Sequence, residues 1–189
     1  MIKVTVPATT ANLGPGFDCL GMALAFYNEH DCELIEDGLE ISTEGEGAIN
    51  LPRDVANLIV RSMQRVFDQV DFQHTGLRLH SINRIPLMGG LGSSSAAIVG
   101  GLIAANELTG NQLTRAELIT LAIEIEGHPD NVAPALLGDL VIVAADNKGP
   151  IVSRVDVPEM KVVVAAPNLQ VSTEEARRLI PKTILHADA

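Results

Sequence analysis

The chain has 189 residues, of which 47% are hydrophobic and 20% are charged, a globular composition that excludes wholesale disorder. Lys and Arg number 13 against 24 Asp and Glu, so the formal net charge of −11 leaves no basic footprint for nucleic acid or for an anionic membrane surface. The N-terminus lacks the charged head and apolar stretch of a signal peptide, and no apolar run approaches about 20 residues. A cytoplasmic location is therefore expected, with Cys19 and Cys32 as free thiols.

Apolar alternation predicts strands, and apolar residues at three- and four-residue spacing predict helices. Strands are expected at residues 2–6, 22–35 (as one strand or two), 39–43, 77–82, 140–144, 151–155 and 161–165. Helices are expected at residues 54–70, 93–108, 114–126 and 173–179, and the glycine-rich stretches 8–21 and 86–92 are expected to be a loop and a turn. Because strands and helices do not alternate regularly, an α+β fold is favoured over a doubly wound sheet.

The domain organisation is suggested by a new strand–helix unit that begins near Lys161 and stops soon afterwards. We therefore expect residues 1–158 to form one domain and residues 159–189 to be the beginning of a second domain that is cut short. An incomplete domain would leave apolar surface uncovered, which favours association, and a homodimer is the simplest form of it.

A run of glycines and serines precedes the apolar helix expected at 93–108. Glycines let the backbone approach a ligand, and a helix N-terminus offers unpaired N–H groups and a partial positive charge, which together suit a phosphate. Serine hydroxyls there can also reach Mg²⁺. The alternative is a tight turn capped by Ser93, and the run matches neither a Walker A loop nor the Rossmann glycine spacing. The run consists of Pro86, Leu87, Met88, Gly89, Gly90, Leu91, Gly92, Ser93, Ser94, Ser95 and Ala96.

Two further polar stretches are candidates for a binding site. The first, residues 7–18, places Asn12 and Asp18 in a glycine–proline turn that could fix the polar groups of a small substrate, although a structural β-turn is the alternative. The second, residues 124–134, ends a helix with Glu126 as a candidate Mg²⁺ ligand and Asn131 as a candidate phosphate or substrate contact. Its alternative is an ordinary polar helix end. Zinc binding by His128 is disfavoured, since the neighbours are hard oxygen groups.

These stretches together resemble the GHMP kinase superfamily, whose ATP loop has the pattern P-x-x-x-G-L-G-S-S-x-A. Residues 7–18, 126–134 and 172–177 resemble one family of that group in particular, the homoserine kinases. The resemblance runs in order along nearly the whole chain. It implies an N-terminal domain like domain 2 of ribosomal protein S5 and a ferredoxin-like C-terminal domain.

The activity implied by the resemblance is transfer of the ATP γ-phosphoryl group to the hydroxyl of L-homoserine, giving O-phospho-L-homoserine for threonine biosynthesis. ATP would lie on the loop Pro86 to Ala96, and Mg²⁺ would be held by Ser94 and Glu126. Asn131 stands where mevalonate kinase-like relatives carry a base-capable Asp, and an amide cannot accept a proton at neutral pH. Catalysis by Ser94, Glu126 and Asn131 would then rest on positioning and charge stabilisation.

The substrate site implied by the resemblance consists of Asn12, Asp18, His128, Asn131 and Arg177. Arg177 is expected to bind the homoserine carboxylate with its two-pronged guanidinium, and Asp18 to pair with the ammonium group. Two alternatives stay open: another GHMP kinase, of the mevalonate or sugar type, and a truncated nucleotide-binding fragment without activity, since homoserine kinases are longer than this chain.

Overall fold

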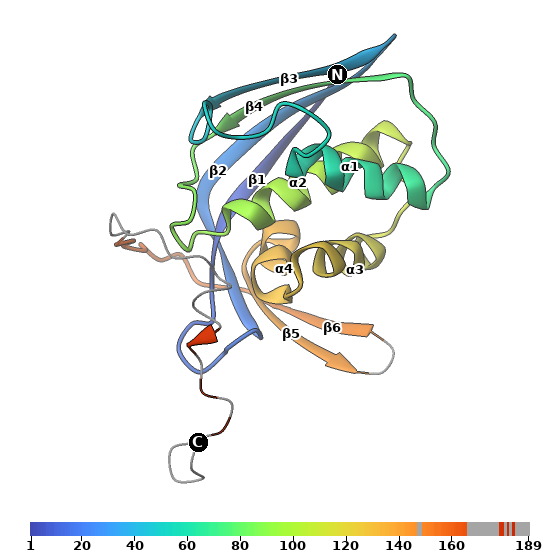
Figure 1. Ribbon diagram of the computed structural model, residues 1–189. Helices are drawn as coiled ribbons and strands as arrows, with labels where there is room; N and C mark the ends of the chain where they lie inside the picture. Colours follow the sequence, from blue (N-terminus) through green and yellow to red (C-terminus); the bar gives the residue numbers. More distant parts are fainter. Residues whose placement is uncertain (147–148, 166–177, 180, 182, 184–189) are drawn as a thin grey trace.

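A computed structural model describes residues 1–146, 149–165, 178–179, 181 and 183. Within this part, a six-stranded mixed sheet curves around four helices that cover one of its faces (Figure 1). The α+β expectation is confirmed. No helix in the described part of the chain is long and apolar enough to cross a membrane.

The sheet is organised by one long strand, β2. Three of the other strands, β1, β4 and β5, pair with it directly. The order is β3-β4-β2-β5-β6, and β1 runs antiparallel along β2 from Ile2 opposite Cys32 to Ala11 opposite Gly21. Among the strands that the structure describes, only β3 and β4 pair in parallel. The strands are β1 (Ile2–Ala11), β2 (Leu20–Ile35), β3 (Gly38–Gly45), β4 (Gly76–Asn83), β5 (Leu140–Asp146) and β6 (Gly149–Val155).

The helices are α1 (Leu58–Gln69), α2 (Ser93–Leu108), α3 (Arg115–Glu126) and α4 (Pro129–Leu137). Helix α1 begins at Leu58 and not at residue 54, because the Asn57 side chain caps it by accepting a hydrogen bond from the Ile59 amide. Helix α3 begins with a capping box, in which Thr114 and Glu117 satisfy each other's backbone amides.

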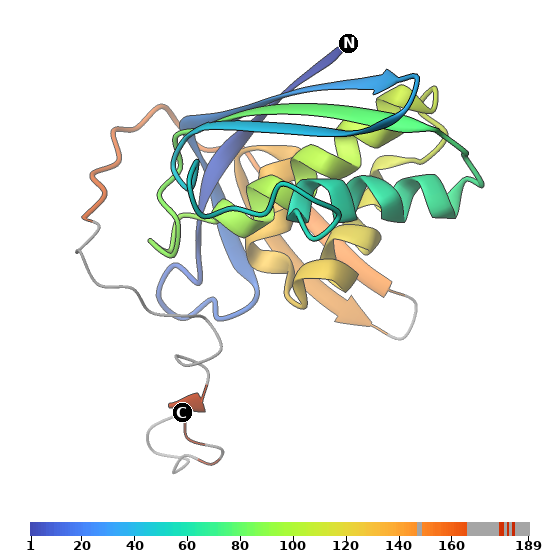
Figure 2. The ribbon, with the colours of Figure 1, turned by 45° about the horizontal axis from the view of Figure 1, so that its top comes forward.

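The core lies around α2, which is buried between the sheet and α1 (Figure 2). Small residues make this burial possible. A Cβ atom added at Gly101 would lie 2.5 Å from the carbonyl oxygen of Ile59 on α1, and one at Gly100 would lie 2.6 Å from the ring of His30 on β2. The two glycines therefore let α2 lie in close contact with both neighbours.

Several expectations are corrected. The first strand continues to Ala11, because a register shift between Pro7 and Ala8 accommodates the proline, so the loop expected at 8–21 begins only at residue 12. Helix α4 was not expected: the residues after Pro129 were assigned to no helix or strand, but they form nine residues of helix, with Pro134 inside it. Residues 161–165 are not a strand but an exposed irregular segment. The helix expected at 173–179 lies almost wholly outside the described residues.

Candidate active site

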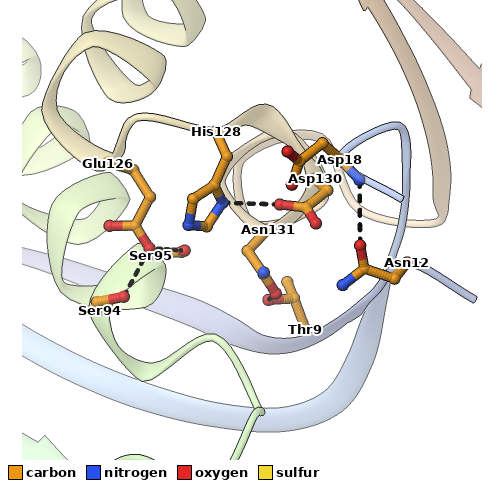
Figure 3. Close-up of polar contacts among 9 residues, drawn as sticks. All are labelled: Thr9, Asn12, Asp18, Ser94, Ser95, Glu126, His128, Asp130 and Asn131. Carbon is orange, nitrogen blue, oxygen red and sulfur yellow. Dashed lines mark hydrogen bonds and ion pairs between the residues drawn. The ribbon is translucent and has the colours of Figure 1, made fainter. Parts of the chain in front are cut away.

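A cavity of about 920 Å³ lies where the glycine–serine loop, the first turn of α2, the beginning of α4 and the end of β1 meet. This volume is in the range of small-molecule sites. Its wall includes Asn12, Ser94, Glu126, His128 and Asn131, which come from three separate segments of the chain (Figure 3). Most of the polar residues that the sequence singled out therefore face one space.

The loop before α2 presents its backbone to this cavity. Met88, Gly90 and Gly92 all have positive φ angles, of 56°, 70° and 68°, so three of five consecutive residues take the left-handed conformation. Gly92 is the N-cap of α2 and has no side-chain capping hydrogen bond, so the first-turn amides keep their donors for a ligand. Seven residues of the loop line the cavity: Leu87, Met88, Gly89, Gly90, Gly92, Ser93 and Ser94.

The other predicted loop residues, Pro86, Leu91, Ser95 and Ala96, are not part of the cavity wall as the structure describes it. Leu91 and Ala96 belong to the hydrophobic core, so their packing holds the loop in place. Ser95 is fully buried and meets the site only through its hydroxyl.

Glu126 lies over the first turn of α2. Its Oε1 accepts hydrogen bonds from the hydroxyls of Ser94, at 2.6 Å, and Ser95, at 2.8 Å (Figure 3). Helix α3 ends directly after Glu126, because Gly127 takes a left-handed conformation with φ 89°. The position of the carboxylate is thus set by a helix end and by two hydroxyls of a neighbouring helix.

The charges on the cavity wall do not favour a polyanion by themselves. Among the lining residues that the structure describes there is no Lys or Arg, whereas Glu126 and Asp130 are both acidic. A triphosphate near Glu126 would be repelled unless a cation lay between them. A carboxylate and a serine hydroxyl are hard oxygen ligands that fit Mg²⁺, which normally takes one or two protein groups and completes its shell with phosphate and water. No group of three or more His, Cys, Asp or Glu side chains suited to a metal occurs in the described residues.

The beginning of α4 holds a histidine–aspartate pair. His128 is the N-cap residue, and its Nδ1 lies 2.8 Å from Asp130 Oδ1 (Figure 3). The side chains are only 15% and 3% exposed. Sequence reasoning missed Asp130, although Pro129 at the first helical position and an acid in the first turn are signs of a helix start. Gly21 on β2 lets α4 approach, since any Cβ there would meet the Asp130 carbonyl oxygen.

Asn131 is held by Thr9, a second residue that sequence reasoning missed. The Thr9 hydroxyl donates to Asn131 Oδ1 at 2.7 Å across 122 residues of sequence. The Thr9 backbone amide also donates to the Leu91 carbonyl oxygen, at 3.0 Å, which joins β1 to the glycine–serine loop. Thr9 lies within the stretch 7–18 that the sequence singled out, but its role could not be predicted, because both contacts depend on the tertiary fold.

The N-terminal loop is ordered by its own polar residues. Asn12 and Asp18 both have positive φ angles, and Asn12 Oδ1 accepts a hydrogen bond from the Asp18 amide at 3.1 Å. Asn12 lines the cavity, whereas Asp18 is not among the lining residues described. Arg177, the predicted partner of the substrate carboxylate, lies outside the described residues.

Comparison with known proteins agrees with this geometry. Residues 57–139 match the profile of the GHMP kinases N terminal domain. The homoserine kinase of Carboxydothermus hydrogenoformans is 48% identical over 189 residues, which is 100% of this chain and 62% of that protein. The crystal structure of homoserine kinase from Cytophaga hutchinsonii superimposes with a TM-score of 0.83 at 33% identity, over 98% of this chain and 62% of that one.

A more distant neighbour, the mevalonate kinase of Methanococcus jannaschii, is 12% identical with a TM-score of 0.63 over 82% of this chain and 56% of that one, which shows the common fold alone. The chain spans about 62% of the length of the curated relatives that it matches. Its similarity to homoserine kinases extends over its whole length, and residues 57–139 resemble the N-terminal domain of the GHMP kinases.

Proposed function

We propose that this protein is a homoserine kinase, which transfers the γ-phosphoryl group of ATP to the hydroxyl of L-homoserine and forms O-phospho-L-homoserine for threonine biosynthesis. The observation that carries the proposal is the Ser94–Ser95–Glu126 cluster at the N-terminus of α2, which opens into the same cavity as Asn131. The choice of homoserine rests on the 48% identity to a homoserine kinase, with 100% of this chain aligned.

The phosphate side of the reaction is served by the loop from Pro86 to Ala96. Its backbone amides, at a helix N-terminus without a side-chain cap, bind the β- and γ-phosphate oxygens. Ser94 and Glu126 would hold Mg²⁺, which would supply the positive charge that the cavity wall lacks and neutralise charge on the transferred group. The acidic Glu126 is thereby compatible with a phosphate site.

The acceptor side is served by Asn131 and His128, with Asn12 across the cavity. The Asn131 amide cannot take a proton, so it orients the homoserine hydroxyl for in-line attack. Asp130 is already engaged by His128, and it holds the imidazole in place at the substrate end of the cavity. Asp18 and Arg177 are assigned to the ammonium and carboxylate groups of homoserine. Catalysis then depends on positioning, which suffices for a loose phosphoryl transfer.

We also propose that residues 1–158 are the ATP-binding unit and that a second unit begins at residue 159. The sheet ends at Val155, and the segment after it is largely exposed, with Val163 94% accessible. An apolar segment of this kind is suited to packing against further protein.

The test is a turnover assay with a panel of acceptors. The protein is incubated with ATP and Mg²⁺ and either L-homoserine, mevalonate or galactose, and the products are followed by ³¹P nuclear magnetic resonance. A new phosphate monoester is expected with L-homoserine alone. In parallel, calorimetry measures whether the protein binds Mg²⁺-ATP.

Two results would contradict the proposal in different ways. Phosphorylation of mevalonate or galactose without any product from homoserine would reject the substrate. A folded protein that binds no Mg²⁺-ATP would reject the kinase assignment itself.

A further inference from the structure

We propose that Thr9 is a positioning residue for phosphoryl transfer, which fixes the Asn131 amide and at the same time sets the distance between Asn131 and the phosphate loop. The inference rests on the proposed function for its kinetic consequences, and on the structure alone for the contact itself. Thr9 is fully buried on β1, so it acts through Asn131 and not on a ligand directly.

The direction of the hydrogen bond determines which way Asn131 faces. A hydroxyl that meets a carbonyl oxygen must donate, so Thr9 occupies Asn131 Oδ1 at 2.7 Å. The planar amide then keeps its Nδ2 hydrogens for the cavity that Asn131 lines. Nδ2 can only donate, and it therefore suits an oxygen acceptor, either the substrate hydroxyl oxygen or a phosphate oxygen. Without Thr9, the amide could rotate and present its carbonyl oxygen to those same oxygens.

The same residue also determines how the loop approaches, through its backbone amide and the volume of its side chain, both of which valine would keep. Gly92 lies directly against Thr9, and a Cβ at Gly92 would meet Thr9 Oγ1 and lie 3.1 Å from Asn131 Oδ1. The Thr9 amide holds the loop through the Leu91 carbonyl oxygen at 3.0 Å. One strand residue thus contacts both the loop that binds phosphates and the amide that orients the acceptor. These two groups must be aligned for in-line transfer, where small displacements have large effects on rate.

Thr9→Val is the informative variant, because it keeps the shape and the strand preference while it removes the hydroxyl. Thr9→Ser restores the donor. Thr5→Val makes the same chemical change at an exposed position of β1 and serves as the matched control. Should Thr9→Val unfold, Thr9→Ala removes the hydroxyl with a smaller side chain. Each is compared with and without Asn131→Ala, because a residue that acts through Asn131 has no further effect once that side chain is gone.

Two measurements are made on the same proteins. Kinetics with ATP and L-homoserine should show kcat lowered about 10- to 100-fold in Thr9→Val, with the KM for ATP within about twofold of wild type. Thr9→Ser should recover most of the rate. The side-chain NH₂ signals of Asn131, assigned by their loss in Asn131→Ala, should shift in Thr9→Val and remain near their wild-type positions in Thr9→Ser.

The two proposals fail in distinguishable ways. Wild-type rate and unmoved Asn131 signals in folded Thr9→Val would overturn the role of Thr9 and leave the kinase intact. A full rate loss from Thr9→Val on the Asn131→Ala background would also overturn it, since Thr9 would then act by another route. Absence of homoserine turnover in the wild type would reject the proposed function, while the nuclear magnetic resonance comparison still decides whether Thr9 orients Asn131.

Discussion

The first turn of α2 and the middle of the same helix are built from equally small residues, yet they perform different tasks. Gly92 and the serines that follow it face the cavity and the Glu126 carboxylate. Gly100 and Gly101 are buried against β2 and α1. The serines mark the first turn in the sequence, but the sequence does not show what either region contacts. The two regions differ in their neighbours: the Glu126 carboxylate and the cavity at the first turn, and closely packed atoms of β2 and α1 in the middle.

This difference predicts that substitutions in the first turn impair ligand binding and rate, whereas substitutions in the middle impair stability. This distinction would be wrong if a first-turn substitution mainly lowered stability, or if a substitution in the middle mainly lowered ligand binding or rate.

The largest effect is expected from Glu126→Gln, which should lower kcat by about 100-fold or more at limiting Mg²⁺, because an amide cannot supply the charge of a carboxylate. The midpoint of urea denaturation should hardly change. Glu124→Gln is the matched control. It removes the same charge from an exposed residue that forms an ion pair with Arg65. Equal rates in the two variants would show that Glu126 is structural.

A pair of glycine variants tests the loop. Gly90 and Gly92 have φ angles of 70° and 68°, so alanine is strained at both, but only at Gly92 would its Cβ meet Thr9. Gly92→Ala should therefore weaken ATP binding by roughly tenfold more than Gly90→Ala does. If the backbone N–H donors of this turn are displaced, the binding free energy falls by about 1–2 kcal/mol. Calorimetric titration with Mg²⁺-ATP measures the difference. Similar affinities in the two variants would show that the contact between Gly92 and Thr9 does not matter for ATP binding.

In the middle of α2, Gly101→Ala should destabilise the fold by about 1–3 kcal/mol, because the new methyl group would overlap the Ile59 carbonyl oxygen. Helix propensity alone would favour alanine by about 1 kcal/mol, so the sign of the result separates the two effects. Urea denaturation gives the free energy of unfolding. A more stable Gly101→Ala variant would show that α1 and α2 do not lie so close together.

The smallest effect concerns His30, which lies beside Gly100 with its Nδ1 on Ser81 at 3.0 Å. Burial lowers the pKa of His30 from 6.5 to about 4. In the unfolded chain His30 is protonated below about pH 6.5, whereas in the folded protein it stays neutral until about pH 4. The stability of the fold therefore decreases as the pH falls from 6.5 to 4. Between pH 7 and 5.5 the loss from this group is about 1 kcal/mol. His30→Gln should lose correspondingly less over the same range, and parallel pH curves for the two proteins would show that His30 is not buried in its neutral form.

The parts of this account that the sequence predicted are those with a local cause. Helix α2 begins at Ser93 and ends at Leu108 as expected, because its glycines precede a continuous run of small apolar residues. The Thr114–Glu117 capping box is also a local pattern, and the structure confirms it. The resemblance to homoserine kinases, which the comparisons confirm, was carried by short motifs of the same kind.

The parts that the sequence did not predict depend on contacts between distant segments. Helix α4 was not predicted. It has nine residues and contains Pro134, and the burial of Val132 and Ala133 outweighs the helix-breaking preference of that proline. Thr9 matters through Asn131, which is 122 residues away and which only the fold brings near, whereas Asp130 had a local sign, as an acid in the first turn of a helix, that was overlooked. Residues 161–165 have a strand-like sequence without a strand to pair with in the described residues.

The most direct test of the central claim is a crystal structure of the protein with Mg²⁺, a non-hydrolysable ATP analogue and L-homoserine. The account predicts the phosphates on the amides between Gly89 and Ser95, Mg²⁺ between the Ser94 hydroxyl and Glu126, and the homoserine hydroxyl within hydrogen-bond distance of Asn131 Nδ2. A triphosphate bound away from the first turn of α2, with Glu126 still held only by Ser94 and Ser95, would contradict it.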